Sequence, residues 1–73
     1  MTIGKTTRVQ LELPEKSFER LKKLREITEA SSYAEVLRAS LRLYEALIEE
    51  TRAGNTVAIK QADGSEVAYR LVF

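Results

Sequence analysis

The chain has 73 residues, enough for one domain, with 44% hydrophobic and 32% charged residues and a formal net charge of +1. It contains neither Cys nor His, which excludes disulfides, thiol or imidazole catalysis and the usual zinc ligands. We therefore expect no enzyme, no catalytic or metal site and no cofactor. No apolar run reaches the ~20 residues that cross a bilayer, and the first residues lack the apolar core of a signal peptide. These features predict a cytoplasmic protein that does not contact a membrane.

The charges are distributed unevenly along the chain. Residues 1–25 carry seven Lys and Arg against three Glu, whereas residues 26–50 carry two Arg against six Glu. The positive first third suits a polyanion such as DNA, but charged helices also serve simply to keep a protein in solution. The basic cluster of Lys22, Lys23 and Arg25 is interpreted in the second way, as a solvated helix face.

The first element predicted is a strand over residues 7–13. Apolar and polar side chains alternate there, which is the pattern of a strand with one buried face. The apolar residues are Val9, Leu11 and Leu13, and the polar ones are Arg8, Gln10 and Glu12. Pro14 ends this strand and suits the first position of a helix, with Glu15 favourably placed near the positive end of that helix.

Two helices are predicted next. The first covers residues 15 to about 29, with an apolar residue at every third position over much of its length. The second begins at a capping box, formed by Ser32 and by Glu35 three residues later, and runs amphipathically to about residue 52. Gly54 follows as the natural left-handed residue, so we expect the helix to stop there.

The remaining segment, residues 56–73, is predicted to form a β-hairpin with its turn near Gly64. A strict two-residue turn would mix apolar and polar side chains on each face. A three-residue loop that ends in Gly64 keeps the apolar residues together, so we predict that loop. The resulting pairs are Ile59 with Val67 and Val57 with Tyr69.

The strand at residues 7–13 has no adjacent strand in the sequence. A lone strand leaves its backbone N–H and C=O groups unpaired, which is unfavourable. Two arrangements satisfy them. Either the strand pairs with the same strand of a second chain about a two-fold axis, or it joins the C-terminal hairpin in a three-stranded sheet.

The order of these elements, beginning with RVQLELPE at residues 8–15 and continuing through the capping box, resembles the ribbon-helix-helix family of Arc, MetJ and CopG type. The resemblance covers roughly residues 5–52. It implies an α+β, mainly α, fold: a β-α-α homodimer with an intermolecular antiparallel ribbon, to which a C-terminal β-hairpin is added. The expected parts are a flexible N-terminal arm, the ribbon-helix-helix domain and the hairpin, at residues 1–5, 6–54 and 55–73.

The resemblance also implies which residues would contact DNA. In this family the outward side chains of the ribbon enter the major groove, and the backbone at the start of the second helix holds a phosphate. By position, the base-reading residues are Arg8, Gln10 and Glu12. The phosphate-contacting residues are Lys5, Thr6, Ser31, Ser32 and Tyr33. Arginine and glutamine bond guanine and adenine edges well, although an exposed strand face would also carry them simply to face water.

Glu12 departs from the family pattern, in which a basic or neutral polar residue is frequent at this position. A carboxylate can accept a hydrogen bond from the amino group of cytosine. If the two-fold axis of the ribbon passes through Gln10, however, Glu12 lies opposite Arg8 of the second copy. Such a cross-strand charge pair contributes up to about 1 kcal/mol. It would occupy an arginine that is needed for a base.

The predicted function is that of a sequence-specific DNA-binding transcriptional regulator, a repressor, whose partners are a second copy of itself and duplex DNA. The alternative is a protein-interaction module or antitoxin on the same scaffold, with weak or lost DNA binding. In that case the C-terminal hairpin binds a protein partner or joins dimers through a free edge. The hairpin has a third interpretation, in which it covers or extends the dimer core.

Overall fold

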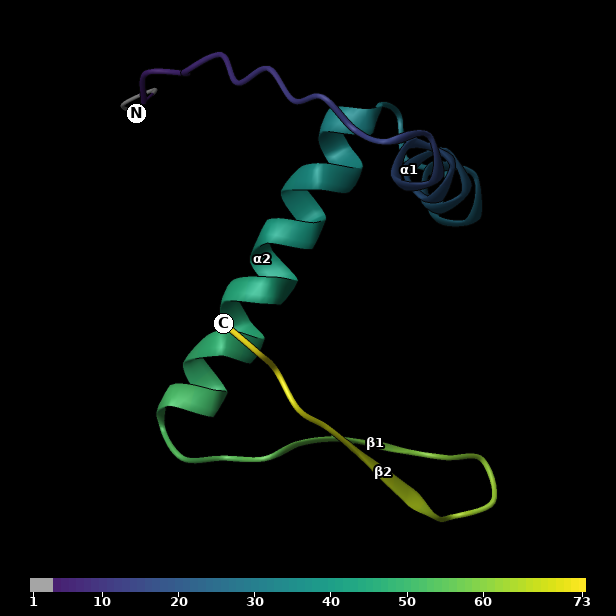
Figure 1. Ribbon diagram of the computed structural model, residues 1–73, viewed down its shortest axis with the longest axis vertical. Coiled ribbons are helices and arrows are strands. Elements are labelled where there is room, and N and C mark those ends of the chain that lie inside the picture. The colour runs from purple at the N-terminus through teal and green to yellow at the C-terminus, as the bar shows by residue number, and fades with distance from the viewer. Residues whose placement is uncertain (1–3) are drawn as a thin grey trace.

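The computed structural model describes residues 4–73, which form two helices followed by a β-hairpin (Figure 1). The elements are helix α1 (Glu15–Thr28), helix α2 (Tyr33–Arg52), strand β1 (Val57–Lys60) and strand β2 (Glu66–Tyr69). Helix α1 lies beside the N-terminal end of the long helix α2, and the hairpin extends from the C-terminal end of α2. The fold is α+β, as predicted, and both predicted helices are confirmed within about a residue at each end.

The structure differs from the prediction at residues 7–13, which form no strand. The whole segment 4–14 lacks regular secondary structure, and the sheet of the described residues consists of β1 and β2 alone. The three-stranded sheet within one chain is therefore absent. The physical reason is that a strand forms only beside a neighbour that bonds its backbone, and neither strand of the described residues pairs with this segment. Residues 1–3 of the predicted arm lie outside the described residues.

Helix α1 starts directly after Pro14, whose φ of −56° suits the entry to a helix. At the other end the chain forms a Schellman turn. The N–H of Ala30 donates to the carbonyl of Arg25 at 3.1 Å. The N–H of Glu29 donates to the carbonyl of Glu26 at 3.2 Å. Glu29 takes a left-handed φ of 55°, which costs a residue with a Cβ atom roughly 1 kcal/mol.

Helix α2 begins at Ser32, whose Oγ accepts a hydrogen bond from the N–H of Glu35 at 3.2 Å. This confirms the part of the predicted capping box in which the serine caps the helix. The carboxylate of Glu35 bonds to Arg38 instead of returning to the cap. The helix ends at Arg52, and Gly54 follows with φ of 89° in the same Schellman geometry. The predicted stop is confirmed.

Strands β1 and β2 pair antiparallel in the predicted register. Ile59 lies opposite Val67, and Val57 lies opposite Tyr69. These four side chains share one face of the hairpin because side chains alternate along a strand. The register predicted from the grouping of apolar residues is therefore confirmed.

Backbone and side-chain bonds close the hairpin loop. The N–H of Gln61 donates to the carbonyl of Ser65 at 2.6 Å, and Gly64 adopts the predicted positive φ, 93°. The carboxylate of Asp63 accepts from the hydroxyl of Ser65 at 2.6 Å and from its N–H at 2.9 Å. These two bonds favour the ionised carboxylate and hold the pKa of Asp63 below its usual value of 3.8.

A single copy of the chain buries very little. Among the described residues, Val36 is the only buried apolar side chain. The chain exposes 7192 Å², whereas a compact monomer of 8.3 kDa exposes about 4600 Å². Its radius of gyration is 15.7 Å, against roughly 11 Å for a compact chain of this length. Neither helix of residues 4–73 has both the length and the apolarity needed to cross a membrane.

Replacing Glu29 by glycine should stabilise the protein by about 0.5–1 kcal/mol, because glycine adopts the left-handed conformation without a Cβ clash. Urea unfolding at one fixed protein concentration measures the change, since association also contributes to stability. The matched control is Gly54→Ala at the equivalent position of α2, which should lower stability. A Glu29→Gly protein that is less stable than the parent would contradict the left-handed turn.

Candidate nucleic-acid interface

The predicted base-reading residues lie on the segment that precedes α1. Arg8, Gln10 and Glu12 are all exposed, as are Lys5 and Thr6 nearer the start of the chain. None of the charged members takes part in an ion pair within the described part of the chain. All five side chains therefore remain open to a ligand or to a second chain.

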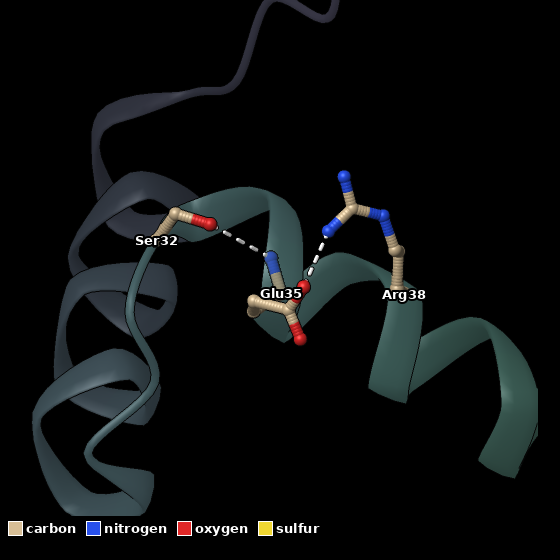
Figure 2. Close-up of polar contacts among 3 residues, drawn as sticks. All are labelled: Ser32, Glu35 and Arg38. Atoms are coloured by element: carbon tan, nitrogen blue, oxygen red, sulfur yellow. Dashed lines mark hydrogen bonds and ion pairs between the residues drawn. The ribbon is translucent and has the colours of Figure 1, made fainter. Parts of the chain in front are cut away.

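The other predicted contacts, Ser31, Ser32 and Tyr33, form the turn into α2. The hydroxyl of Ser32 is used as the helix cap, and the carboxylate of Glu35 accepts a hydrogen bond from Arg38 Nη1 at 2.6 Å. Figure 2 shows both contacts. A phosphate would therefore be bound here mainly by the first backbone N–H groups of the helix, which have no partner inside it. Such groups, together with the helix dipole, favour an anion.

Arg25 of α1 holds this turn in place, a role that the sequence did not reveal. Its Nη2 donates to the carbonyl of Ser31 at 3.2 Å, and its Nε lies 3.5 Å from the carbonyl of Ala30. The guanidinium carbon lies 4.9 Å from the ring centre of Tyr33, within cation–π range. The available signal was the position of Arg25 in the last turn of a helix, where basic side chains can bond terminal carbonyls.

An aromatic contact joins α1 to the start of α2. The rings of Phe18 and Tyr33 meet edge to face, with centres 5.6 Å apart and an angle of 68° between their planes. The ammonium of Lys22 lies 5.4 Å from the ring centre of Phe18. Two members of the basic cluster predicted to be a solvated face, Lys22 and Arg25, thus cover aromatic rings.

The segment with the base-reading residues reaches the same aromatic contact. Leu11 and Leu13 line a hollow together with Phe18, Leu21 and Leu37, side chains that come from α1 and α2. In Figure 1 the segment accordingly runs past the N-terminal end of α2. The two groups of predicted DNA contacts are therefore brought to the same end of the molecule.

Charges of both signs surround the start of α2. A second hollow there is lined by Lys22 and Arg25 but also by Glu26 and Glu29. The side chains alone therefore do not create a strongly positive pocket. An anion at this place would depend on the helix N–H groups, and a polyanion would depend more on the basic residues of the exposed segment.

Comparison of the chain with protein-family models, with curated proteins and with solved structures finds no match. The ribbon-helix-helix resemblance accordingly stays an expectation based on residues and spacing. The side chains and the exposed surfaces of the chain itself are therefore the basis for proposing what it binds.

Substitution of Arg25 by alanine should loosen the turn into α2 and lower stability by about 1 kcal/mol, because two carbonyls lose a charged donor. In the Arg25→Ala protein, hydrogen exchange should be faster than in the parent at the amides of Glu35 and Val36, which bond to Ser32. Lys23→Ala is the matched control, since Lys23 is exposed on the same helix. Equal exchange rates in the two variants would refute a positioning role for Arg25.

Proposed function

We propose that the chain acts as a homodimer that binds duplex DNA through a ribbon made from residues 7–13 of two copies. The observation that carries the proposal is that this alternating segment is exposed and unpaired within the described chain. Val9 is 81% exposed and Leu11 60% exposed. Antiparallel pairing with the same segment of a second copy would satisfy the backbone groups and cover the apolar side chains together.

The surface of the single chain supports association. Its 7192 Å² exceed the area of a compact monomer of this mass by about 2600 Å². Permanent homodimers bury roughly 2000–5000 Å² or more in total. The excess exposed area, summed over two copies, is of the magnitude that such an interface would bury. Apolar residues on one face in the middle of α2 also need cover: Leu41 and Tyr44 are each more than half exposed. A partner that packs along α2 would bury them.

A two-fold axis through Gln10 gives the ribbon a self-complementary register. Val9 of one copy then faces Leu11 of the other on the inner side. On the outer side Arg8 faces Glu12, and their opposite charges attract. The register is thus favourable on both faces of the ribbon.

Such a ribbon presents Arg8, Gln10 and Glu12 of both copies to the major groove, where arginine and glutamine read base edges. The start of α2, oriented by Arg25, would bind a backbone phosphate and fix the register on the duplex. Occupancy of an operator by this dimer would repress transcription. We place this activity in the cytoplasm.

A second candidate function is protein binding by the hairpin, as in an antitoxin on the same scaffold. It is favoured by the apolar face of the hairpin, on which Ile59, Val67 and Tyr69 are 41–51% exposed. A partner with an apolar surface would cover this face. DNA binding would then be weak or absent.

Val9→Glu should abolish the ribbon, because it places a charge on the side that has to be buried between the copies. The molar mass in solution should halve relative to the parent protein when measured by light scattering or sedimentation equilibrium. Gln10→Thr is the control, since it changes an outward side chain of the same strand without adding a charge and should leave the mass unchanged. If both variants keep the parent's mass, the segment does not form a ribbon.

Glu12→Gln should tighten DNA binding several-fold, because it removes a negative charge from the DNA-facing side and releases Arg8 from its cross-strand pair. Fluorescence titration against promoter duplexes at two salt concentrations measures the effect. A specific site should bind with a dissociation constant of roughly 10⁻⁸ M or lower and a steep salt dependence. Weaker binding by Glu12→Gln would instead identify Glu12 as a base contact. Weak, sequence-blind binding by the parent would favour the second candidate function.

A further inference from the structure

The hairpin has a strand edge that no other element covers. Strand β1 contacts the end of α2, whereas β2 contacts only β1 among the elements of residues 4–73. Figure 1 shows the hairpin projecting away from the helices. A regular, uncovered edge is a template for another strand. We propose that β2 pairs antiparallel with β2 of a second copy, which gives a four-stranded sheet across two chains.

The loop geometry identifies which backbone groups face this open edge. The carbonyl of Ser65 accepts from Gln61, so it points toward β1. Backbone groups alternate in direction along a strand, and therefore those of Glu66, Ala68 and Arg70 point away from β1. These are the residues whose N–H and C=O groups a second strand would bond.

Several registers keep the outward-pointing backbone groups of the two β2 strands opposite each other, and one of them also places opposite charges together. When Ala68 lies opposite its own copy, Glu66 lies opposite Arg70 twice, once on each side of the axis. A shift of the pairing by two residues sets Ala68 opposite Glu66 or opposite Arg70, which gives no charge pair. A shift by four residues brings Glu66 against its own copy or Arg70 against its own copy. Because opposite charges across strands attract and like charges repel, the register centred on Ala68 is favoured.

The other face of the sheet fits the same register. Val67 of one copy lies opposite Tyr69 of the other, and a β-branched residue beside an aromatic one is a favourable cross-strand pair. In the single chain these side chains are 41% and 51% exposed. The pairing would extend the apolar face of one hairpin, which also carries Val57 and Ile59, into that of the second.

Neither Glu66 nor Arg70 has a competing ion-pair partner among the described residues. The only ion pair among residues 4–73 joins Glu35 to Arg38. Glu66 and Arg70 are both exposed. Across the hairpin Glu66 lies opposite Lys60 without forming an ion pair, and Arg70 lies beyond the end of the ladder. Both side chains are therefore free to pair with a second copy.

The outer edge of β1 is a poorer match. Its register about Ala58 would set Lys60 opposite Thr56, which gives no charge pair. β1 also contacts α2, which limits access to that edge. Self-pairing is therefore assigned to β2.

The test uses the full chain with reversed charges. Arg70→Glu sets the introduced glutamate against Glu66 in both halves of the interface and should weaken self-association about tenfold or more. The complementary chain carries Glu66→Arg with Lys60→Glu, so that positions 60 and 66 stay opposite in charge within the hairpin. Its introduced arginine at position 66 faces Arg70 of the second copy, so this chain should also fail to pair. Each protein alone should show half the parent's molar mass.

A one-to-one mixture of the two charge-reversed proteins should restore the parent's mass, because each glutamate of one chain then faces an arginine of the other. This outcome also excludes misfolding as the cause of the single defects. The β2 interface is refuted if Arg70→Glu keeps the parent's mass or if the mixture fails to associate.

Failure of this interface is distinguishable from failure of the ribbon. If both exist in a closed assembly of four chains, Val9→Glu and Arg70→Glu each halve the mass, and the two together leave a monomer. If only the β2 pairing exists, the parent is a dimer and Arg70→Glu alone is monomeric. If only the ribbon exists, Arg70→Glu has no effect on the mass.

Discussion

Residues 4–73 of a single copy leave most of their large apolar side chains exposed, and the rest of the structure depends on that constraint. Only Val36 is a buried apolar residue among the described ones, and three large apolar residues in the middle of α2 are more than half exposed. The helices persist because each satisfies its own backbone. The segment at residues 7–13 cannot do so, and it forms no regular secondary structure. Association would supply what the chain lacks.

The elements that could be predicted from the sequence are those held by interactions between residues close together in the chain. The Ser32 cap, the stop at Gly54 and the pairing of Ile59 with Val67 depend on residues a few positions apart, and all were confirmed. A strand at residues 7–13 would instead need a neighbouring strand, and none of the described residues pairs with this segment. The alternating pattern of residues 7–13 indicates which side chains would be buried in a strand. It does not supply the neighbouring strand that would bury them.

The candidate site shows the same division. Its residues were assigned by position from the ribbon-helix-helix resemblance, whereas Arg25 was interpreted as part of a solvated face. Its bonds to the carbonyls of Ala30 and Ser31 exist because the chain reverses sharply after α1. That reversal requires Glu29 to adopt a left-handed φ, a conformation that its residue type does not indicate. Contacts of this kind can be predicted only when the path of the backbone through the turn is known. The spacing of residue types along the sequence does not give that path.

The order of charges along residues 8–12 and along the open edge of β2 has a consequence for which segments can pair. The N-terminal segment reads from Arg8 to Glu12, whereas the hairpin edge reads from Glu66 to Arg70. If the two were aligned antiparallel by their centres, arginine would face arginine and glutamate would face glutamate, which is destabilising. If both proposed pairings form, each segment would favour its own copy over the other. The reversed order of charges would then keep the two segments of one small protein from pairing with each other.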